Sequence, residues 1–137
     1  MWTASSVINA LKNHRQICAK IAIIENKLQR ARSGYPDDKN NPGMLDRQYL
    51  ELVDRRDAVE GWILLLPTEE RFLIHTHLIQ GLDWAKTLVE YEKMWGKLNC
   101  RSERTLKRIQ SKAIDRIVIC LNQIDSLLGS DQFNIEA

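Results

Sequence analysis

The sequence predicts an all-α protein. Six glycines and three prolines in 137 residues leave few breaks, so long helices can form. Few stretches show the alternation of β-branched and polar residues that is typical of strands. Apolar residues instead recur every three or four positions along most of the chain, which is the spacing of one helical face. We expect an N-terminal helical hairpin over residues 1–65, a three-helix unit over 66–128 and a polar tail over 129–137.

The first expected helix runs from about Ser5 to Arg32. Ser5 or Ser6 is a suitable N-cap, and Gly34 is a suitable stop. Basic residues near the end suit the negative end of the helix dipole. The apolar face consists of Val7, Leu11, His14, Cys18, Ile21, Ile24 or Glu25, and Leu28. This pattern predicts one long amphipathic helix.

Residues 33–43 consist almost entirely of turn formers, so we expect a loop there. A second helix follows over about 44–65, and its face consists of Leu45, Tyr49, Leu52, Arg55 or Arg56, Val59 and Ile63. Two such helices joined by a short loop pack as an antiparallel hairpin. The hairpin either only stabilises the domain or serves for dimerisation or partner docking, because an isolated helix pair leaves apolar flanks exposed.

Pro67 marks a break, after which Thr68 can cap a helix that ends at Gly81. The apolar residues of that helix are Phe72, Leu73, Leu78 and Ile79. Asp83 can cap the next helix, which carries Trp84, Leu88, Tyr91 and Trp95. Residues 96–100 are expected to form a turn. These signals predict two short helices that lead to a third.

The third helix of this unit is expected over about 102–128, with Ser102 as its N-cap. Its apolar stripe consists of Leu106, Ile109, Ala113, Ile117, Cys120, Leu121, Ile124 and Leu128. Residues 101–116 include six basic and two acidic residues, a net charge of +4 in a chain whose total is +2. We expect positive charge to be concentrated on this element, as it is where a protein contacts a phosphate backbone.

The motifs of residues 62–121 resemble region 4 of bacterial sigma factors. The shared features are the Leu-Pro-x-Glu-Glu-Arg opening at 66–71, the glycine at 81, Ser-x-x-Thr at 102–105 and Ala-Ile at 113–114. The resemblance is closer to the sigma-region-4-like phage regulators of the ArpU and RinA types. It rests on Tyr91, Ser102, Arg104, Thr105, Lys107 and Arg108. It implies a phage late-gene transcription regulator whose residues 66–128 form a helix-turn-helix DNA-binding domain.

In a helix-turn-helix, the start of the last helix would carry the contacts with DNA. The predicted base contacts are Arg101, Ser102, Arg104 and Thr105, and the predicted phosphate contacts are Lys107, Arg108 and Lys112. The alternative is an ordinary solvated basic face. Twenty residues separate Gly81 from Ser102, more than a compact motif needs. Residues 92–100 therefore either extend the second helix or form a wing-like loop.

Other classes of function lack support in the sequence. No phosphate-binding glycine loop, nucleophile elbow or His-Glu-x-x-His stretch occurs, so we expect no enzyme activity and no cofactor. The three cysteines are scattered and form no paired ligand spacing with the histidines, so we expect no metal site. No run of eighteen apolar residues and no secretory signal occurs, so we expect a cytoplasmic protein without a membrane span.

The aromatic residues allow two interpretations. Tryptophans can stack on bases, as in single-strand binders, but at helical spacing they are more often core. We expect Trp62 and Trp84 in the core and leave Trp95 open. The leading hypothesis is a sequence-specific double-stranded DNA-binding regulator whose N-terminal hairpin serves either for dimerisation or as a surface for RNA polymerase. The alternative is a helical interaction protein that docks on polymerase or another host factor without binding DNA.

Overall fold

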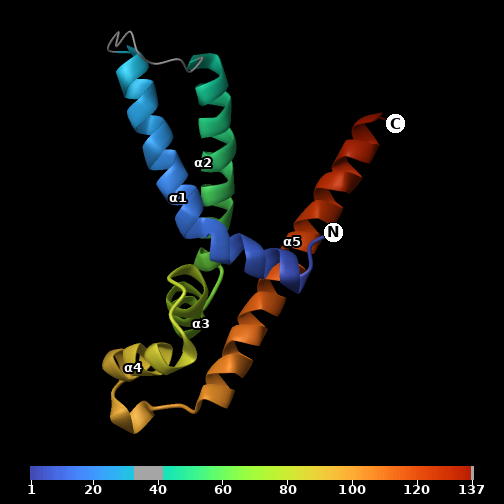
Figure 1. Cartoon of the computed structure of the whole chain (residues 1–137). Coiled ribbons are helices and arrows are strands. Elements are labelled where there is room, and N and C mark those ends of the chain that lie inside the picture. The colour runs from blue at the N-terminus through green and yellow to red at the C-terminus, as the bar shows by residue number, and fades with distance from the viewer. Residues whose placement is uncertain (33–41, 137) are drawn as a thin grey trace.

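The computed structural model describes the backbone of residues 1–32 and 42–136, and the side chains of 1–32 and 43–128. Its elements are α1 (Ala4–Arg32), α2 (Pro42–Leu64), α3 (Thr68–Leu73), the π-helical η1 (Ile74–Ile79), α4 (Trp84–Trp95), the 3₁₀ turn η2 (Lys97–Asn99) and α5 (Glu103–Glu136). No strand occurs within these ranges, which confirms the all-α prediction. In Figure 1, the α1–α2 hairpin and the second half of α5 form the two sides of a V above α3 and α4.

The two helices of the hairpin form nearly as predicted, but the N-cap of α1 is different. Thr3, rather than Ser5 or Ser6, caps α1: Thr3 Oγ1 accepts from the Ser6 amide at 3.2 Å, and Ser6 Oγ accepts from the Thr3 amide at 2.9 Å. α2 begins at Pro42, because proline suits the first turn of a helix. Most of the expected loop and the Gly34 stop lie in residues 33–41, outside the described part of the chain.

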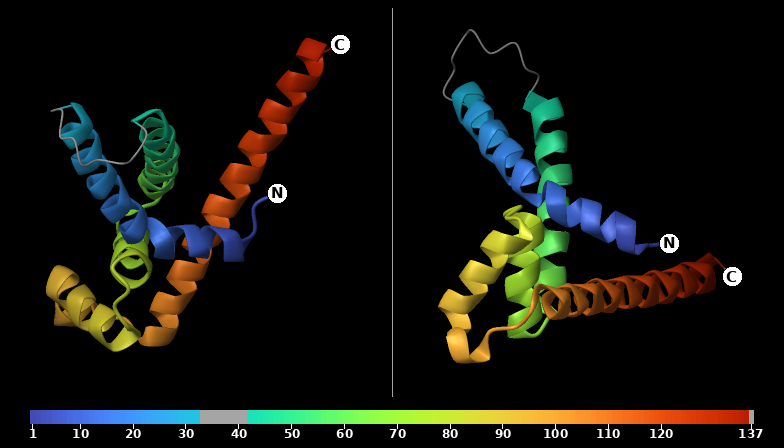
Figure 2. Two further views of the ribbon diagram at one scale, coloured as in Figure 1. Left: turned by 45° about the horizontal axis from the view of Figure 1, so that its top comes forward. Right: turned by 60° about the horizontal axis from the view of Figure 1, so that its bottom comes forward.

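One hydrophobic core joins the hairpin to the rest of the molecule. Its buried residues are Val7, Leu11, Val59, Trp62, Leu66, Ile74, Leu78, Ile79, Ala113, Ile114 and Ile117. They come from α1, α2, η1 and α5, and Leu66 lies in the connection between α2 and α3. The predicted division between residues 65 and 66 therefore passes through a shared core. The base of the hairpin is structural, and only its outer part extends away from the body (Figure 2).

A smaller cluster closes the outer part of the hairpin. Ile24 and Leu28 from α1 pack against Leu45 from α2, and the half-buried Tyr49 and Leu52 cover them. The Tyr49 hydroxyl donates to Glu25 Oε1 across the two helices at 3.2 Å. These contacts hold α1 and α2 together as the predicted antiparallel pair.

The helix before Gly81 widens at its end. α3 starts at Thr68 without a side-chain cap, so the predicted Thr68 cap is wrong and Pro67 occupies that position. The chain then continues as η1, where the Gln80 amide donates to the carbonyl of His75, five residues earlier, at 2.9 Å. Gly81 ends the helix with a φ of 75°, a left-handed conformation that favours glycine.

The segment between Gly81 and Ser102 extends the second helix and forms no wing. Asp83 caps α4 as predicted, since its Oδ1 accepts from the Lys86 amide at 2.8 Å. α4 continues to Trp95, Gly96 turns the chain with a φ of 83°, and η2 adds a single 3₁₀ turn. The extra residues thus lengthen α4 and its connection to α5.

α5 is longer than predicted. It continues to Glu136 rather than ending near residue 128, so the expected tail over 129–137 is helical as far as it is described. The predicted tail begins at Gly129, and a single glycine disfavours a helix by only about 1 kcal/mol. That cost is too small to end a helix whose apolar spacing continues up to it. The second half of α5 consequently projects from the body as one rod (Figure 1).

Candidate nucleic-acid interface

α3, α4 and the start of α5 enclose a second small core. Leu73, Tyr91 and Leu106 are buried in it, one from each helix. The half-buried residues around them are Phe72, Trp84, Leu88, Trp95 and Ile109. Because these side chains pack against Leu106 and Ile109 of α5, the first turns of α5 are held in place by α3 and α4.

The aromatic residues belong to this packing and to the main core. Trp62 is buried and meets Trp2 edge to face, as expected for a core residue. Trp84 is only half-buried and stacks on His77, with ring centroids 3.8 Å apart. Trp95, which the sequence left open, stacks on Tyr91 at 4.5 Å. All four tryptophans therefore have aromatic neighbours within the protein.

Arg101 is exposed but pairs with side chains of its own unit. Its Nε lies 2.7 Å from Glu69 Oε1 and also donates to the Tyr91 hydroxyl at 3.1 Å. The Tyr91 hydroxyl donates to the same Glu69 oxygen at 2.7 Å. Burial and this hydrogen bond raise the pKa of Tyr91 above its usual value, which keeps the hydroxyl protonated as a donor. Arg101 thus links the connection before α5 to α3 and α4, and its predicted base contact stays a prediction.

Ser102 and Thr105 bond to each other at the start of α5. Ser102 Oγ accepts from the Thr105 amide at 3.1 Å, and the two hydroxyls lie 2.9 Å apart. Ser102 is therefore the N-cap, as the sequence predicts. Both hydroxyls already have partners in the protein, so their assignment as base contacts is less direct than the sequence suggests.

Replacing Ser102 with alanine is expected to lower the free energy of unfolding by about 0.5–2 kcal/mol, because the cap to Thr105 is lost. Urea denaturation measures this loss. Asp83→Ala is the matched control, since it removes the equivalent cap from α4. If Ser102→Ala leaves stability unchanged while Asp83→Ala lowers it, the capping role of Ser102 is wrong.

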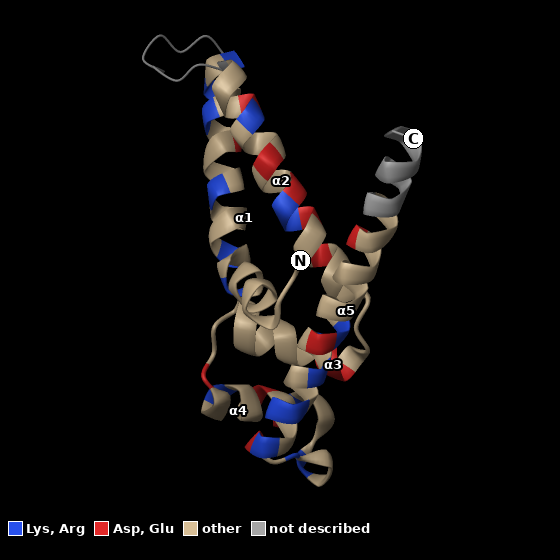
Figure 3. Ribbon diagram, turned by 90° about the vertical axis from the view of Figure 1, so that its right-hand side faces the viewer, with Lys and Arg blue, Asp and Glu red and all other residues tan. Residues whose placement is uncertain are grey.

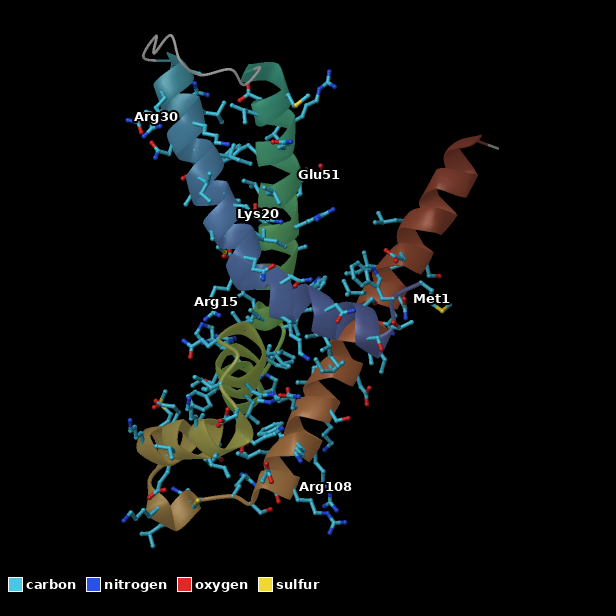
Figure 4. All side chains as sticks on the ribbon, viewed as in Figure 1. Met1, Arg15, Lys20, Arg30, Glu51 and Arg108 are labelled. Atoms are coloured by element: carbon cyan, nitrogen blue, oxygen red, sulfur yellow. The ribbon has the colours of Figure 1, made fainter. Side chains whose placement is uncertain are left out.

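Three basic side chains on α5 are exposed and have no ion-pair or hydrogen-bond partner in the described part of the chain. These are Arg104, Arg108 and Lys112. They are spaced by four residues, so they form one stripe about 12 Å long on the helix. Figure 4 shows Arg108 pointing away from the body at this end of α5. The stripe is the part of the predicted site that is available to a ligand.

Lys107 lies beside this stripe with weaker internal contacts. Its Nζ is 4.0 Å from Glu103 Oε1 one turn earlier, and it lies 5.9 Å from the ring centre of Trp84. The ion pair is exposed, so it contributes little and is easily exchanged for another anion. Glu103 opposes a phosphate near the helix start, and Lys107 partly offsets that charge.

Arg116 is exposed, but its charge is paired with a buried carboxylate. Its Nη2 lies 3.3 Å from Glu70 Oε1, and Glu70 is only 6% exposed. The other oxygen of Glu70 has no hydrogen-bond partner within the described residues, so the carboxylate depends on Arg116. Losing that partner would leave a buried charge unpaired. The charge of +4 counted over 101–116 therefore overstates the surface that a phosphate backbone could meet.

His77 and Gln110 form a contact that helps to fix the angle of α5. A His77 ring nitrogen hydrogen-bonds to Gln110 Oε1 at 2.7 Å, while the ring stacks on Trp84. The contact thus joins η1, α4 and α5. No local pattern reveals it, because the two residues are 33 positions apart.

Positive charge is not confined to α5, contrary to the prediction. α1 carries six basic residues and one acidic residue, a net charge of +5. Figure 3 shows these basic residues distributed along its whole length. No dense run marks them in the sequence, because they are spread over 29 residues.

Among the histidines and cysteines, His14 and Cys18 contact each other one turn apart on α1. Buried His14 lies 3.6 Å from Cys18 Sγ and 4.0 Å from Glu60 Oε1, and burial lowers the pKa of His14 below its usual value. The described residues contain no group of three or more His, Cys, Asp or Glu placed to hold a metal ion. Among the helices that the structure describes, none is long and apolar enough to cross a membrane.

No family model, curated protein or solved structure matches this chain. The likeness to sigma region 4 and to the ArpU and RinA types therefore stays a prediction that rests on the quoted motifs. What the geometry adds is a class of surface: a helix start with an exposed cationic stripe, seated on two shorter helices.

Proposed function

We propose that this chain is a sequence-specific double-stranded DNA-binding transcription regulator, of the kind that phages and prophages encode. The observation that supports it best is the exposed stripe of Arg104, Arg108 and Lys112 on the first turns of α5. A helix start of this kind fits the major groove, where an α-helix can reach base edges.

The stripe assigns different contacts to its two ends. Arg104 lies nearest the N-terminus of α5 and can pair bidentately with guanine. Arg108 and Lys112 follow on the same face and can neutralise phosphates. The positive end of the helix dipole adds to the attraction for the backbone. Arg101 has a different role, since its link to Glu69 and Tyr91 orients the connection that leads into α5.

A second candidate function is docking on RNA polymerase or another host factor without DNA. The favouring observation is the connection between α4 and α5, where Leu98 is fully exposed beside the half-buried Trp95. These two side chains border a depression that also includes Glu69 and Asn99. A partner that covers Leu98 and enters this depression would remove apolar surface from water, which favours association. A pull-down of polymerase without retention on heparin would favour this function.

Replacing Arg104 and Arg108 together with alanine is expected to weaken binding to the operator. Each lost phosphate contact lowers the salt slope by about one unit, and a lost base contact relaxes specificity by about 1–3 kcal/mol. A gel-shift series over salt concentration, with upstream DNA from the protein's own genome, measures both effects.

The matched control is Lys27→Ala combined with Arg30→Ala, which removes the same charge from α1. Figure 4 shows Arg30 near the far end of the hairpin, away from Arg108. We expect the control to bind like wild type. If the Arg104 and Arg108 variant binds like wild type too, or if both variants lose equal affinity, the assignment of the stripe is wrong.

A further inference from the structure

The second half of α5 carries an apolar face without a partner in the described part of the chain. Ala113, Ile114 and Ile117 are buried in the main core. The same helical face continues with Ile124, which is 44% exposed, and Leu128, which is 57% exposed. Burial ends because α5 leaves the body there, not because the apolar spacing stops (Figure 1). This stripe is long enough to pack against another element.

A groove between α1 and α2 offers a matching surface. Two depressions adjoin along the hairpin and share Arg55, with volumes of about 310 and 270 Å³. Their walls are mostly aliphatic and aromatic, and the main apolar side chains are Ile17, Ile23, Leu52, Val59 and Trp62. Together they have room for several aliphatic side chains of a docked helix.

The groove begins where the two sides of the V meet. Trp2 lines its lower depression, and the Trp2 amide donates to Asn122 Oδ1 on α5 at 2.8 Å. The groove then continues along the hairpin to Ile23 and Lys20. The second half of α5 runs away from the hairpin (Figure 2). Because α5 is one continuous helix, its own second half does not reach the upper part of the groove.

The two surfaces also have opposite charge. α1 carries a net charge of +5 and α2 a net charge of −2, and the charged residues that line the groove itself are Lys20, Arg55 and Glu51, a net charge of +1. Over residues 117–128, the part of this half whose side chains are described, α5 carries one acidic residue, Asp125, and no basic residue, a net charge of −1. An acidic, apolar helix therefore suits this groove better than a basic or neutral one does. The chain itself contains such a helix.

We propose that the second half of α5 from another copy of this chain occupies the α1–α2 groove. The arrangement is reciprocal: each copy provides both the helix and the groove, so a two-fold axis closes the dimer without leaving either surface free. The dimer rests on packing and charge and does not depend on DNA binding. Should the proposed function hold, two α5 helix starts would be presented to two half-sites.

Solution mass tests this proposal in the absence of DNA. Light scattering and sedimentation equilibrium over a range of protein concentrations should show a dimer for the full chain. Ile124→Gln with Leu128→Gln should weaken association at least about a hundredfold, because two apolar contacts are lost. Val89→Gln, which changes an exposed apolar residue on α4, is the matched control and should leave the mass unchanged.

A second variant separates a reciprocal dimer from a simple pairing of α5 helices. Lys20→Glu with Ile23→Gln alters only the groove, and it should also yield monomers. Mixing the groove variant with the α5 variant should restore a dimer that has one intact contact. Circular dichroism shows whether each variant keeps the helical content of the wild type. Added salt should weaken the wild-type dimer, because opposite charges meet in it.

Three results would overturn the proposal. A wild-type chain that stays monomeric at about 100 µM shows that the surfaces do not associate, since packed interfaces of this kind bind more tightly. A groove variant that remains dimeric shows that the groove is not used. Two monomeric variants that do not associate when mixed show that helix and groove do not meet. Loss of operator binding alone has no bearing on these masses, so the two proposals fail separately.

Discussion

Replacing Ile117 with alanine is expected to lower the free energy of unfolding by about 2–5 kcal/mol. Ile117 is fully buried in the core that α1, α2, η1 and α5 share, so the cavity opens where all four meet. A loss of this size is a large fraction of the stability of a typical domain, about 5–15 kcal/mol. Since the core is common, the hairpin and the three-helix unit should weaken together.

Native-state hydrogen exchange, followed on peptides from α2 and from α4, measures whether this happens. Ile119→Ala is the matched control, because Ile119 is exposed two positions away on the same helix and should change stability by less than about 0.5 kcal/mol. Should α4 lose protection in Ile117→Ala while α2 keeps it, the two parts would be independent domains divided near residue 65.

Replacing Leu106 with alanine is expected to lower the free energy of unfolding by about 2–5 kcal/mol as well. The loss of packing should be centred on α3, α4 and the start of α5. Leu106 is fully buried against Leu73 and Tyr91, in the core that holds the start of α5. The cavity should loosen the first turns of α5 without removing any basic side chain. If those turns are the DNA-reading surface, operator affinity should fall although Arg104 and Arg108 remain.

Exchange on peptides from α3 and α4, together with a gel shift at a fixed salt concentration, tests this expectation. Leu98→Ala is the matched control, because it makes the same chemical change at a fully exposed position of the same unit. Operator affinity that survives in Leu106→Ala despite lost protection in α3 and α4 would show that DNA binding does not require an ordered α5 start.

The basic surface was only partly predictable, because charge can be counted from sequence but pairing cannot. Arg101 and Arg116 belong to the same dense run as Arg104 and Arg108, and nothing in the spacing separates them. Their partners, Glu69 and Glu70, lie more than thirty positions earlier on α3. Folding brings these carboxylates to α5, so two of the six basic residues in the run become structural.

For α1, by contrast, a count over a short window underestimates the basic surface. A count over a short window favours dense runs, so the basic residues of 101–116 stood out while the larger net charge of α1 did not. On a long helix, however, residues three, four and seven apart share a face, and distant charges act together. Of these basic residues, the structure places Lys20 at the groove between α1 and α2.

The sequence by itself determined the helices, because each depends on neighbours within a few positions: periodic apolar residues, the Asp83 and Ser102 caps and the Gly81 stop. It did not determine how those helices share surfaces. The common core of the hairpin and α5, the internal pairing of Arg101 and Arg116 and the exposed second half of α5 follow from contacts between distant segments. Such contacts depend on shape and relative orientation, for which the spacing along one helix carries no information.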